Sequence, residues 1–291
     1  MISSYTFQDT TDKNIKRFVD RKGNWTHYYI ISDKKFVPAV NHVLGLGYNK
    51  GPRFNEYLLN ARPEEARKKL ETAGEEGSRT HAAIRDIARG VKVDLKTSYL
   101  NDLTGRQEML NPDEWDNLLA YMRFVECYKP HIIADEFAVY SPKGKYAGTA
   151  DILVTLEVPK GDKFFPKTVH DKRILVLVDW KTSSRVWNEY RAQLASYRHA
   201  MVEREQFKKF YKSFKGMDFI AVVRLGTNHK IGYEVVVWSG KEAEKTYKDK
   251  FRSAYEIYLE HEPVFEPRVE EIPTELYQPL PVAKIKKHKK K

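Results

Sequence analysis

The sequence predicts an α/β (α+β) fold in which a central mixed β-sheet is flanked by helices and preceded by an N-terminal hairpin and a helical lobe. Two observations carry this prediction. The hydrophobic period changes at about residue 131 from helical spacing to apolar runs typical of strands. Strand candidates are then clustered between helix candidates, an order that produces a sheet covered by helices. The 291 residues, 41% hydrophobic and 13% aromatic, suffice for a real core.

The first 130 residues predict a hairpin followed by helices. Residues 25–38 place aromatic and β-branched residues on either side of a polar Ser-Asp-Lys-Lys turn, which is typical of a hairpin. Pro52 and Pro63 are placed as first-turn prolines, and two glutamates follow Pro63, the charge favoured at a helix start. The pattern then predicts a helix over 63–89, possible breaks in it at Gly74 or Gly77, a polar connection over 90–110, and a helix that Asn-Pro-Asp-Glu opens at 111–114 and that ends before Pro130.

The rest of the chain predicts five strands and two helices. Strand candidates cover 131–140, 146–158, 173–181, 218–225 and 230–238, and a polar loop fills 158–172. An amphipathic helix over 187–206 is expected to cross the sheet, because bulky residues recur there at helical spacing: Trp187, Tyr190, Leu194, Tyr197 and Met201. A second helix is expected over 240–260.

We expect one structural unit with three parts: the hairpin and helical lobe over 1–130, the sheet-containing core over 131–261, and an extended Pro/Glu segment with a disordered basic tail over 262–291. The chain lacks an 18-residue apolar run, and its N-terminus lacks the apolar core of a secretory signal, so we expect a soluble, cytoplasmic protein without a membrane partner. Cys127 is the single cysteine, which excludes an internal disulfide, a four-cysteine zinc site and an all-cysteine iron–sulfur cluster.

The formal net charge of +11 depends strongly on the last eight residues, KIKKHKKK. Removing the six lysine charges of this segment from +11 leaves +5 for the rest of the chain. The body of the protein is therefore only mildly basic. Strong attraction to a polyanion such as nucleic acid must come from a local patch or from the tail.

An acid and a base end the most apolar strand candidate, in LVLVDWKTSS. Side chains alternate across a strand, so Asp179 and Lys181 are expected on one face and Val178 with Trp180 on the other. A strand that is apolar on both faces belongs in the middle of a sheet, where an unpaired carboxylate is strongly unfavourable. The sequence therefore indicates that something neutralises Asp179.

Two further acids are expected on the preceding strands. Asp151 follows Gly148-Thr149-Ala150, small residues that allow a ligand or metal to approach the backbone closely. Glu136 is expected on a strand face otherwise made of Ile132, Ala134 and Ala138. Carboxylates gathered in a partly buried place take up protons unless a cation is present, and such oxygen ligands suit Mg²⁺ or Mn²⁺. A lysine beside them suits chemistry on an anion, and phosphodiester hydrolysis uses the ion, its water and the ammonium together.

Each of these residues has an ordinary explanation when taken alone. A single aspartate at a strand end is more often a turn former or a helix cap than a ligand, and Asp179 with Lys181 can be a simple ion pair. Gln193 and Tyr197, at positions i and i+4 of the crossing helix, can be ordinary packing. His81 lies on the stripe of Ile84 and Ala88, where a hydrogen-bonded core histidine is the default reading.

The joint pattern resembles the PD-(D/E)XK nuclease superfamily and, within it, the RecB-like branch. It consists of Gly-x-x-x-His at 77–81, a strand glutamate at 136, Gly-Thr-Ala-Asp at 148–151, Asp-Trp-Lys-Thr at 179–182 and Gln-x-x-x-Tyr at 193–197. The resemblance covers roughly residues 25–200 and implies a restriction-endonuclease-like core over 131–261, acting in DNA recombination or repair. Asp151 is preceded by Ala instead of Pro, and Asp179 stands in place of Glu; both variants suit this branch.

The resemblance also implies roles for individual residues. His81, Asp151, Asp179 and the backbone carbonyl of Trp180 would hold Mg²⁺ or Mn²⁺, and Lys181 would be the catalytic lysine. Glu136 would be an outer ligand or a water-orienting acid, and Gln193 with Tyr197 would position the site and the nucleic-acid strand. Candidate phosphate contacts in the helical lobe are Lys50, Arg53 and Arg79.

The expected protein is therefore a metal-dependent deoxyribonuclease, an exonuclease acting on free ends of single- or double-stranded DNA. It resembles stand-alone members, without an iron–sulfur cluster and without ATP, because the chain has one cysteine and lacks a Gly-x-x-x-x-Gly-Lys-[Ser/Thr] phosphate loop. Two alternatives stay open: a catalytically silent nuclease fold that binds DNA or a partner, and a small-molecule phosphodiesterase. The choices of DNA against RNA, exonuclease against endonuclease, polarity and oligomeric state also stay open.

Overall fold

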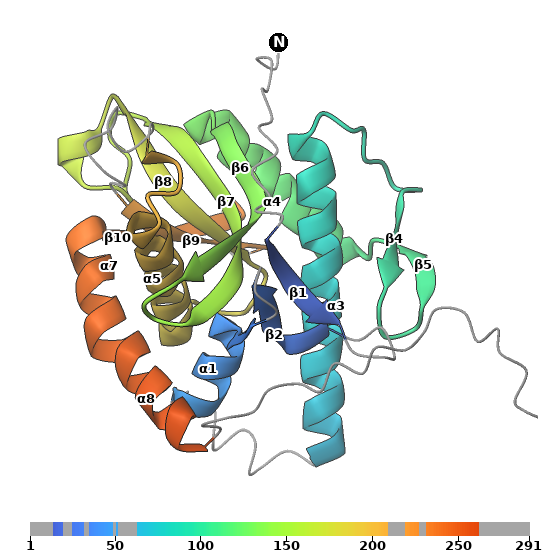
Figure 1. The fold of residues 1–291 in the computed structure, drawn as a ribbon. Coiled ribbons are helices and arrows are strands. Elements are labelled where there is room, and N and C mark those ends of the chain that lie inside the picture. Colours follow the sequence, from blue (N-terminus) through green and yellow to red (C-terminus); the bar gives the residue numbers. More distant parts are fainter. Residues whose placement is uncertain are drawn as a thin grey trace, which may run out of the picture.

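A five-stranded mixed sheet forms the centre of the computed structural model, which describes residues 14–19, 25–31, 35–48, 51, 63–208, 219–226 and 231–261 (Figure 1). The strand order is β10-β9-β8-β7-β6, and all neighbours are antiparallel except the parallel pair β8 and β9. The strands are β6 (His131–Ser141), β7 (Tyr146–Val158), β8 (Lys172–Lys181), β9 (Phe219–Leu225) and β10 (Tyr233–Ser239). The predicted mixed sheet flanked by helices is confirmed.

The central strand β8 is nearly continuous in apolar residues because both of its faces are covered by helices. Leu175 and Leu177 belong to one hydrophobic cluster, whereas Val176, Val178 and Trp180 belong to the other. Polar residues lie only at the two ends of β8: Lys172 and Arg173 at its start, and Asp179 and Lys181 at its finish. That end is where the candidate site lies.

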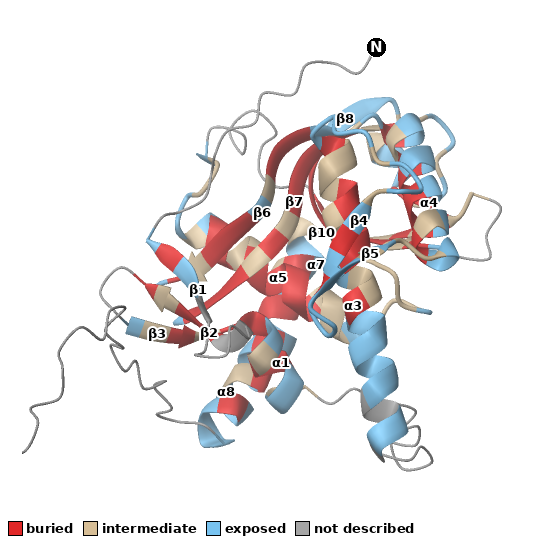
Figure 2. Cartoon of the chain, turned by 90° about the vertical axis from the view of Figure 1, so that its right-hand side faces the viewer, coloured by how far each residue is buried: buried red, intermediate tan, exposed pale blue. Residues whose placement is uncertain are grey.

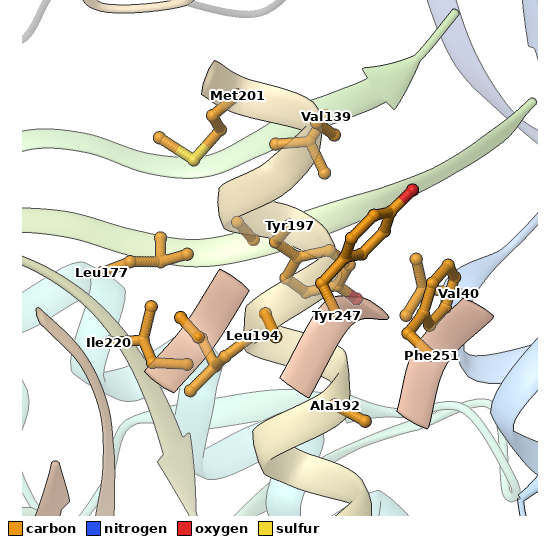
Figure 3. Close-up of a cluster of buried hydrophobic side chains, with 14 of the residues drawn as sticks. Val40, Val139, Leu177, Ala192, Leu194, Tyr197, Met201, Ile220, Tyr247 and Phe251 are labelled. Atoms are coloured by element: carbon orange, nitrogen blue, oxygen red, sulfur yellow. The ribbon is translucent and has the colours of Figure 1, made fainter. Parts of the chain in front are cut away.

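One face of the sheet is covered by α5 (Asn188–Glu203) together with α1 (Val40–Gly47) and the C-terminal helices. Figure 3 shows Leu194, Tyr197 and Met201 of α5 among side chains from β8, β9 and the C-terminal helical segment. The C-terminal segment consists of α7 (Gly240–Thr246), a π-helical turn η2 (Tyr247–Phe251) and α8 (Arg252–His261). Both predicted helices are thus present, and the second one contains a π-helical turn.

The other face is covered by α3 (Pro63–Ala88) and α4 (Pro112–Tyr128). Buried residues of α4 include Tyr121 and Phe124, which pack edge-on against the Trp180 ring at centroid distances of 5.3 Å. The N-terminal half of α3 extends beyond the sheet and is mostly exposed, whereas its C-terminal half joins the core (Figure 2). Because both hydrophobic clusters combine residues from before and after residue 130, the lobe and the sheet share one core.

The N-terminal hairpin is confirmed as β2 (Trp25–Ile31) paired with β3 (Lys35–Pro38). A third strand, β1 (Ile15–Val19), pairs with β2 and was not predicted. Tyr29 and Val37 of this small sheet pack against Ala138 and Ala147 of the large one. The small sheet therefore covers the β6–β7 edge of the core.

Two expectations for the helical lobe need correction. Helix α3 runs unbroken through Gly74 and Gly77, since helix-favouring residues surround both glycines and each is helical. The supposed connection over 90–110 contains a hairpin of β4 (Ser98–Asn101) and β5 (Arg106–Met109), whose turn uses Gly105 at a φ of +67°. The predicted start of α4 is confirmed: Asn111 and Glu114 form a capping box, with Pro112 as first helical residue.

Several expectations concern residues outside the described ranges. Pro52 as a first-turn proline, Lys50 and Arg53 as phosphate contacts, and the segment 262–291 with its basic tail all lie there. Within the described residues, no helix has both the length and the apolar character needed to cross a membrane.

Candidate active site

The end of β8 carries the first part of the site. Lys181 Nζ lies 2.7 Å from Asp179 Oδ2, so the predicted shared face of these two residues is confirmed. Trp180 between them points into the opposite hydrophobic cluster with Val178, as strand alternation predicts. The Asp179 side chain is 1% exposed and that of Lys181 is 19% exposed.

Asp151 on β7 lies beside this pair. Ile152 pairs with Val178 in the antiparallel register. Asp151, the residue before Ile152, therefore lies next to Asp179, the residue after Val178. The backbone N–H of Trp180 donates to Asp151 Oδ2 over 3.0 Å. The same two strands that build the core therefore bring the two aspartates together.

His81 reaches the site from α3. Its Nε2 lies 3.0 Å from the carbonyl oxygen of Trp180, and its Nδ1 lies 3.5 Å from Asp151 Oδ2. Because a carbonyl oxygen only accepts, Nε2 carries a proton and donates it to Trp180. We refer to His81, Asp151, Asp179 and Lys181 as the four-residue cluster. Ile84 and Ala88 on the same side of α3 are buried, and they anchor the helix on the sheet.

Burial and mutual electrostatic interactions shift the pKa values of all four residues of the cluster. Burial raises the pKa of Asp179 to about 6, although Lys181 and His81 oppose this shift and Asp151 adds to it. Burial also raises the pKa of Asp151. Burial disfavours the ammonium of Lys181, but the two aspartates outweigh it and raise the Lys181 pKa. Burial, with the Lys181 charge, lowers the pKa of His81, so its imidazole is neutral near pH 7.

Two features of the cluster bear on what it could bind. Neither carboxylate oxygen of Asp179 has a hydrogen-bond partner of good geometry, although both are buried. A neutral His81 that donates from Nε2 points its Nδ1 lone pair towards a carboxylate oxygen of Asp151, so two acceptors face each other. A proton or a metal ion satisfies such a pair, and oxygen donors with one imidazole suit Mg²⁺ or Mn²⁺.

The described residues do not form a ready-made group of three or more His, Cys, Asp or Glu ligands. The donor atoms of the four-residue cluster have partners within the protein. Asp151 accepts from Trp180, His81 donates to Trp180, and Asp179 is paired with Lys181. A bound ion would have to replace or share these contacts.

The strand face expected to carry Glu136 with Ile132, Ala134 and Ala138 is interrupted in the structure. Strand β6 has a register shift between Ile132 and Ala134, and Glu136 has a left-handed backbone with a φ of +41°, so simple alternation fails. Ile132 and Ala134 consequently belong to different clusters. Glu136 lies opposite Asp151 in the β6–β7 register and forms an ion pair with Arg85 of α3, one helical turn after His81.

Gly148, the first of the small residues before Asp151, makes room for a side chain of the protein itself. A Cβ on Gly148 would lie 2.4 Å from Cε1 of Tyr197, so the glycine admits the Tyr197 ring of α5 against the strand. Gln193 Nε2 donates to the Tyr197 hydroxyl over 3.1 Å, and both residues are buried. Their placement suits positioning of β7 beneath the site more than direct contact with a DNA strand.

Gly148→Ala is expected to lower the free energy of unfolding by about 1–3 kcal/mol, because the added methyl overpacks the contact with Tyr197. Thermal or urea unfolding measures the change. Gly45→Ala on the exposed side of α1 is the control, since its Cβ meets nothing within 4 Å. Equal stability of the wild type and Gly148→Ala would contradict the packing role.

Arg79 is not placed to contact phosphate. Its Nε donates to Glu114 over 2.8 Å and its Nη1 to Glu108 over 3.1 Å, while its side chain is 7% exposed. The arginine thus ties α3 to α4 and to the β4–β5 hairpin. Sequence spacing could not show this, because both partners come from later segments.

Arg79→Ala is expected to destabilise the fold by about 3–5 kcal/mol, because it leaves the Glu114 carboxylate, 1% exposed, without its guanidinium. Chemical denaturation checks this value. Arg106→Ala, an exposed arginine on the same hairpin, is expected to stay within about 0.5 kcal/mol of the wild type. A similar effect of both substitutions would argue against the structural role of Arg79.

A groove of about 1130 Å³ opens at the cluster, and His81 and Lys181 lie on its wall. Its other walls come from the exposed half of α3, the start of α4, the segment after β8 and the start of α5. Trp187 and Tyr190 line it as well, next to Lys181. Helical spacing in the sequence identified these two aromatic residues only as parts of a helix, and neither they nor Arg85 were predicted as site residues.

A scan of the chain against protein-family models gives no match, and a search of curated proteins gives none either. The resemblance to RecB-like nucleases therefore rests on the motif residues.

Proposed function

We propose that this protein is a divalent-metal-dependent deoxyribonuclease of the RecB-like type, with a restriction-endonuclease-like core. The observation that carries the proposal is the convergence of His81, Asp151, Asp179 and Lys181 in one cluster, of which His81 and Lys181 line the groove. These residues are separated by up to 100 positions in the sequence, and the ordinary explanation of each one does not require the others. Their joint arrangement matches the needs of phosphodiester hydrolysis.

Asp151, Asp179 and His81 would hold Mg²⁺ or Mn²⁺, with the Trp180 carbonyl as a further oxygen donor. When bound, the ion supplies Lewis-acid activation of water and neutralises charge on the phosphate. Lys181 is placed to orient the attacking water or to stabilise the negative charge that develops on phosphorus. Tyr197 and Gln193 of α5 hold β7 in place through the contact of the Tyr197 ring with Gly148. Glu136 can orient water once its ion pair with Arg85 is broken.

The direct test is a gel assay with end-labelled linear DNA and circular DNA, each in single- and double-stranded form, with Mg²⁺ or Mn²⁺. We expect cleavage of linear DNA that stops on chelation. Loss of label with intact circles indicates an exonuclease. Binding that is insensitive to chelator and yields no product would indicate a silent fold, and activity limited to a chromogenic small diester would indicate a phosphodiesterase.

Ion binding is expected to strengthen as the pH rises through about 6. Asp179 has its pKa raised to about 6 by burial, so below that pH a proton competes with the ion for its carboxylate. The increase in melting temperature on adding Mn²⁺ should therefore be small at about pH 5 and larger at about pH 7. A shift that stays constant over this range would exclude Asp179 as a ligand.

A further inference from the structure

We propose that Trp187 and Tyr190, which line the groove beside Lys181, form a stacking site for the bases of single-stranded DNA together with Arg185, which lies over the Trp187 ring. This inference rests on the proposed function and specifies its substrate. It concerns residues that the RecB-like motifs do not include. We call these three residues the aromatic wall.

The aromatic wall is continuous with the four-residue cluster. Trp187 is the N-cap of α5 and Tyr190 follows in its first turn, and both residues line the groove. The Nζ of Lys181 lies 4.8 Å from the centroid of the Tyr190 ring. A base on this wall would therefore be adjacent to a phosphate held at the cluster.

Arg185 extends the wall. Its guanidinium carbon lies 3.6 Å from the centroid of the Trp187 ring. Nucleobases stack on aromatic rings and on guanidinium planes alike, and such stacking tolerates any base sequence. The arginine also adds a positive charge next to the rings. The wall thus offers both surfaces that single-strand-binding proteins use.

The charges of the groove favour a single strand over a duplex. Among the described lining residues five are acidic, namely Glu76, Asp113, Glu114, Asp116 and Glu189, of which Glu114 is buried and paired with Arg79. The basic lining residues besides His81 are Arg123 and Lys181. A duplex exposes phosphates along both strands and would bring them against these carboxylates. A single strand can turn its bases to the aromatic wall and a single phosphate to the cluster.

The test compares Trp187→Leu, which removes the ring, with Trp187→Phe, which keeps one. With short oligothymidylate as substrate, the leucine variant should raise KM roughly 5- to 150-fold and change kcat much less. The phenylalanine variant should stay close to the wild type. A substrate with one abasic nucleotide beside the scissile bond should lose affinity for the wild type, with little further loss in Trp187→Leu.

The proposed stacking site would be overturned if the leucine and phenylalanine variants behaved alike on both substrates. Cleavage of duplex DNA as efficient as that of single strands would overturn it as well. Failure of the proposed function is distinguishable, because it appears as absence of metal-dependent cleavage of every DNA form by the wild type. In that case, fluorescence anisotropy of labelled oligothymidylate with the same variants still decides whether the aromatic wall binds single strands.

Discussion

Asp179→Asn is expected to lower metal-dependent DNA cleavage by at least about 1000-fold, the loss that follows when an ion contributing several kcal/mol to the transition state is no longer held. Asp179 is the most buried acid of the four-residue cluster, and neither of its oxygens has a hydrogen bond of good geometry. Asparagine keeps the shape of the side chain but removes the charge that a divalent ion needs. Both cleavage rates and Mn²⁺ binding by calorimetry should show the loss.

Asp171→Asn is the matched control for this substitution. Asp171 immediately precedes β8 and has a left-handed backbone with a φ of +58°, a conformation that asparagine tolerates. The control should keep wild-type cleavage and ion binding. Wild-type rates in Asp179→Asn, with the fold intact by circular dichroism, would remove the proposed metal site.

Lys181→Met is expected to lower cleavage by about 10²–10⁴-fold while Mn²⁺ binding is kept or becomes tighter. The ammonium lies 2.7 Å from Asp179 Oδ2 and repels any cation at that carboxylate, so its removal favours the ion. The lysine acts on the phosphate or its water and does not hold the metal. In this variant the cleavage rate should therefore fall while calorimetry shows Mn²⁺ binding that is no weaker than that of the wild type.

Lys172→Met, at the opposite end of β8, is the matched control, because its Nζ donates to the Thr168 carbonyl over 2.7 Å and lies far along the strand from the site. Lys181→Met removes the partner of a buried carboxylate, so its folding is best checked with Mn²⁺ present. Equal loss of ion binding in Lys181→Met and Asp179→Asn would assign the lysine a structural role instead.

Strand periodicity predicted β7 and β8 closely and, with them, the geometry of the Asp-Trp-Lys end. Alternation along a strand is a local property, so it places Asp179 and Lys181 on one face whatever the rest of the chain does. Capping residues likewise predicted the start of α4 correctly, since Asn111 and Glu114 act within one helical turn. The short strands β1, β4 and β5 escaped prediction because pairing with a neighbour, and not a strong local pattern, defines them.

Glu136 and Arg79 show where local patterns fail. A register shift and a left-handed residue in β6 interrupt the face expected for Ile132, Ala134, Glu136 and Ala138, and this distortion depends on the pairing of β6 with β7. Arg79 has the sequence context of an exposed helical arginine, yet α4 and the β4–β5 hairpin enclose it. Gly148 likewise looked like space for a ligand, whereas the ring of Tyr197 fills that space.

Local patterns in the sequence were enough to predict the mixed sheet, its main helices and the same-face pair of acid and lysine, because each depends on the spacing of neighbouring residues. The three-dimensional packing was needed to show that His81 of α3 reaches Asp151, that Arg85 pairs with Glu136, and that Trp187 and Tyr190 line the groove beside Lys181. These contacts join segments far apart in the chain. Their geometry follows from how helices pack on the two faces of the sheet, which no local pattern encodes.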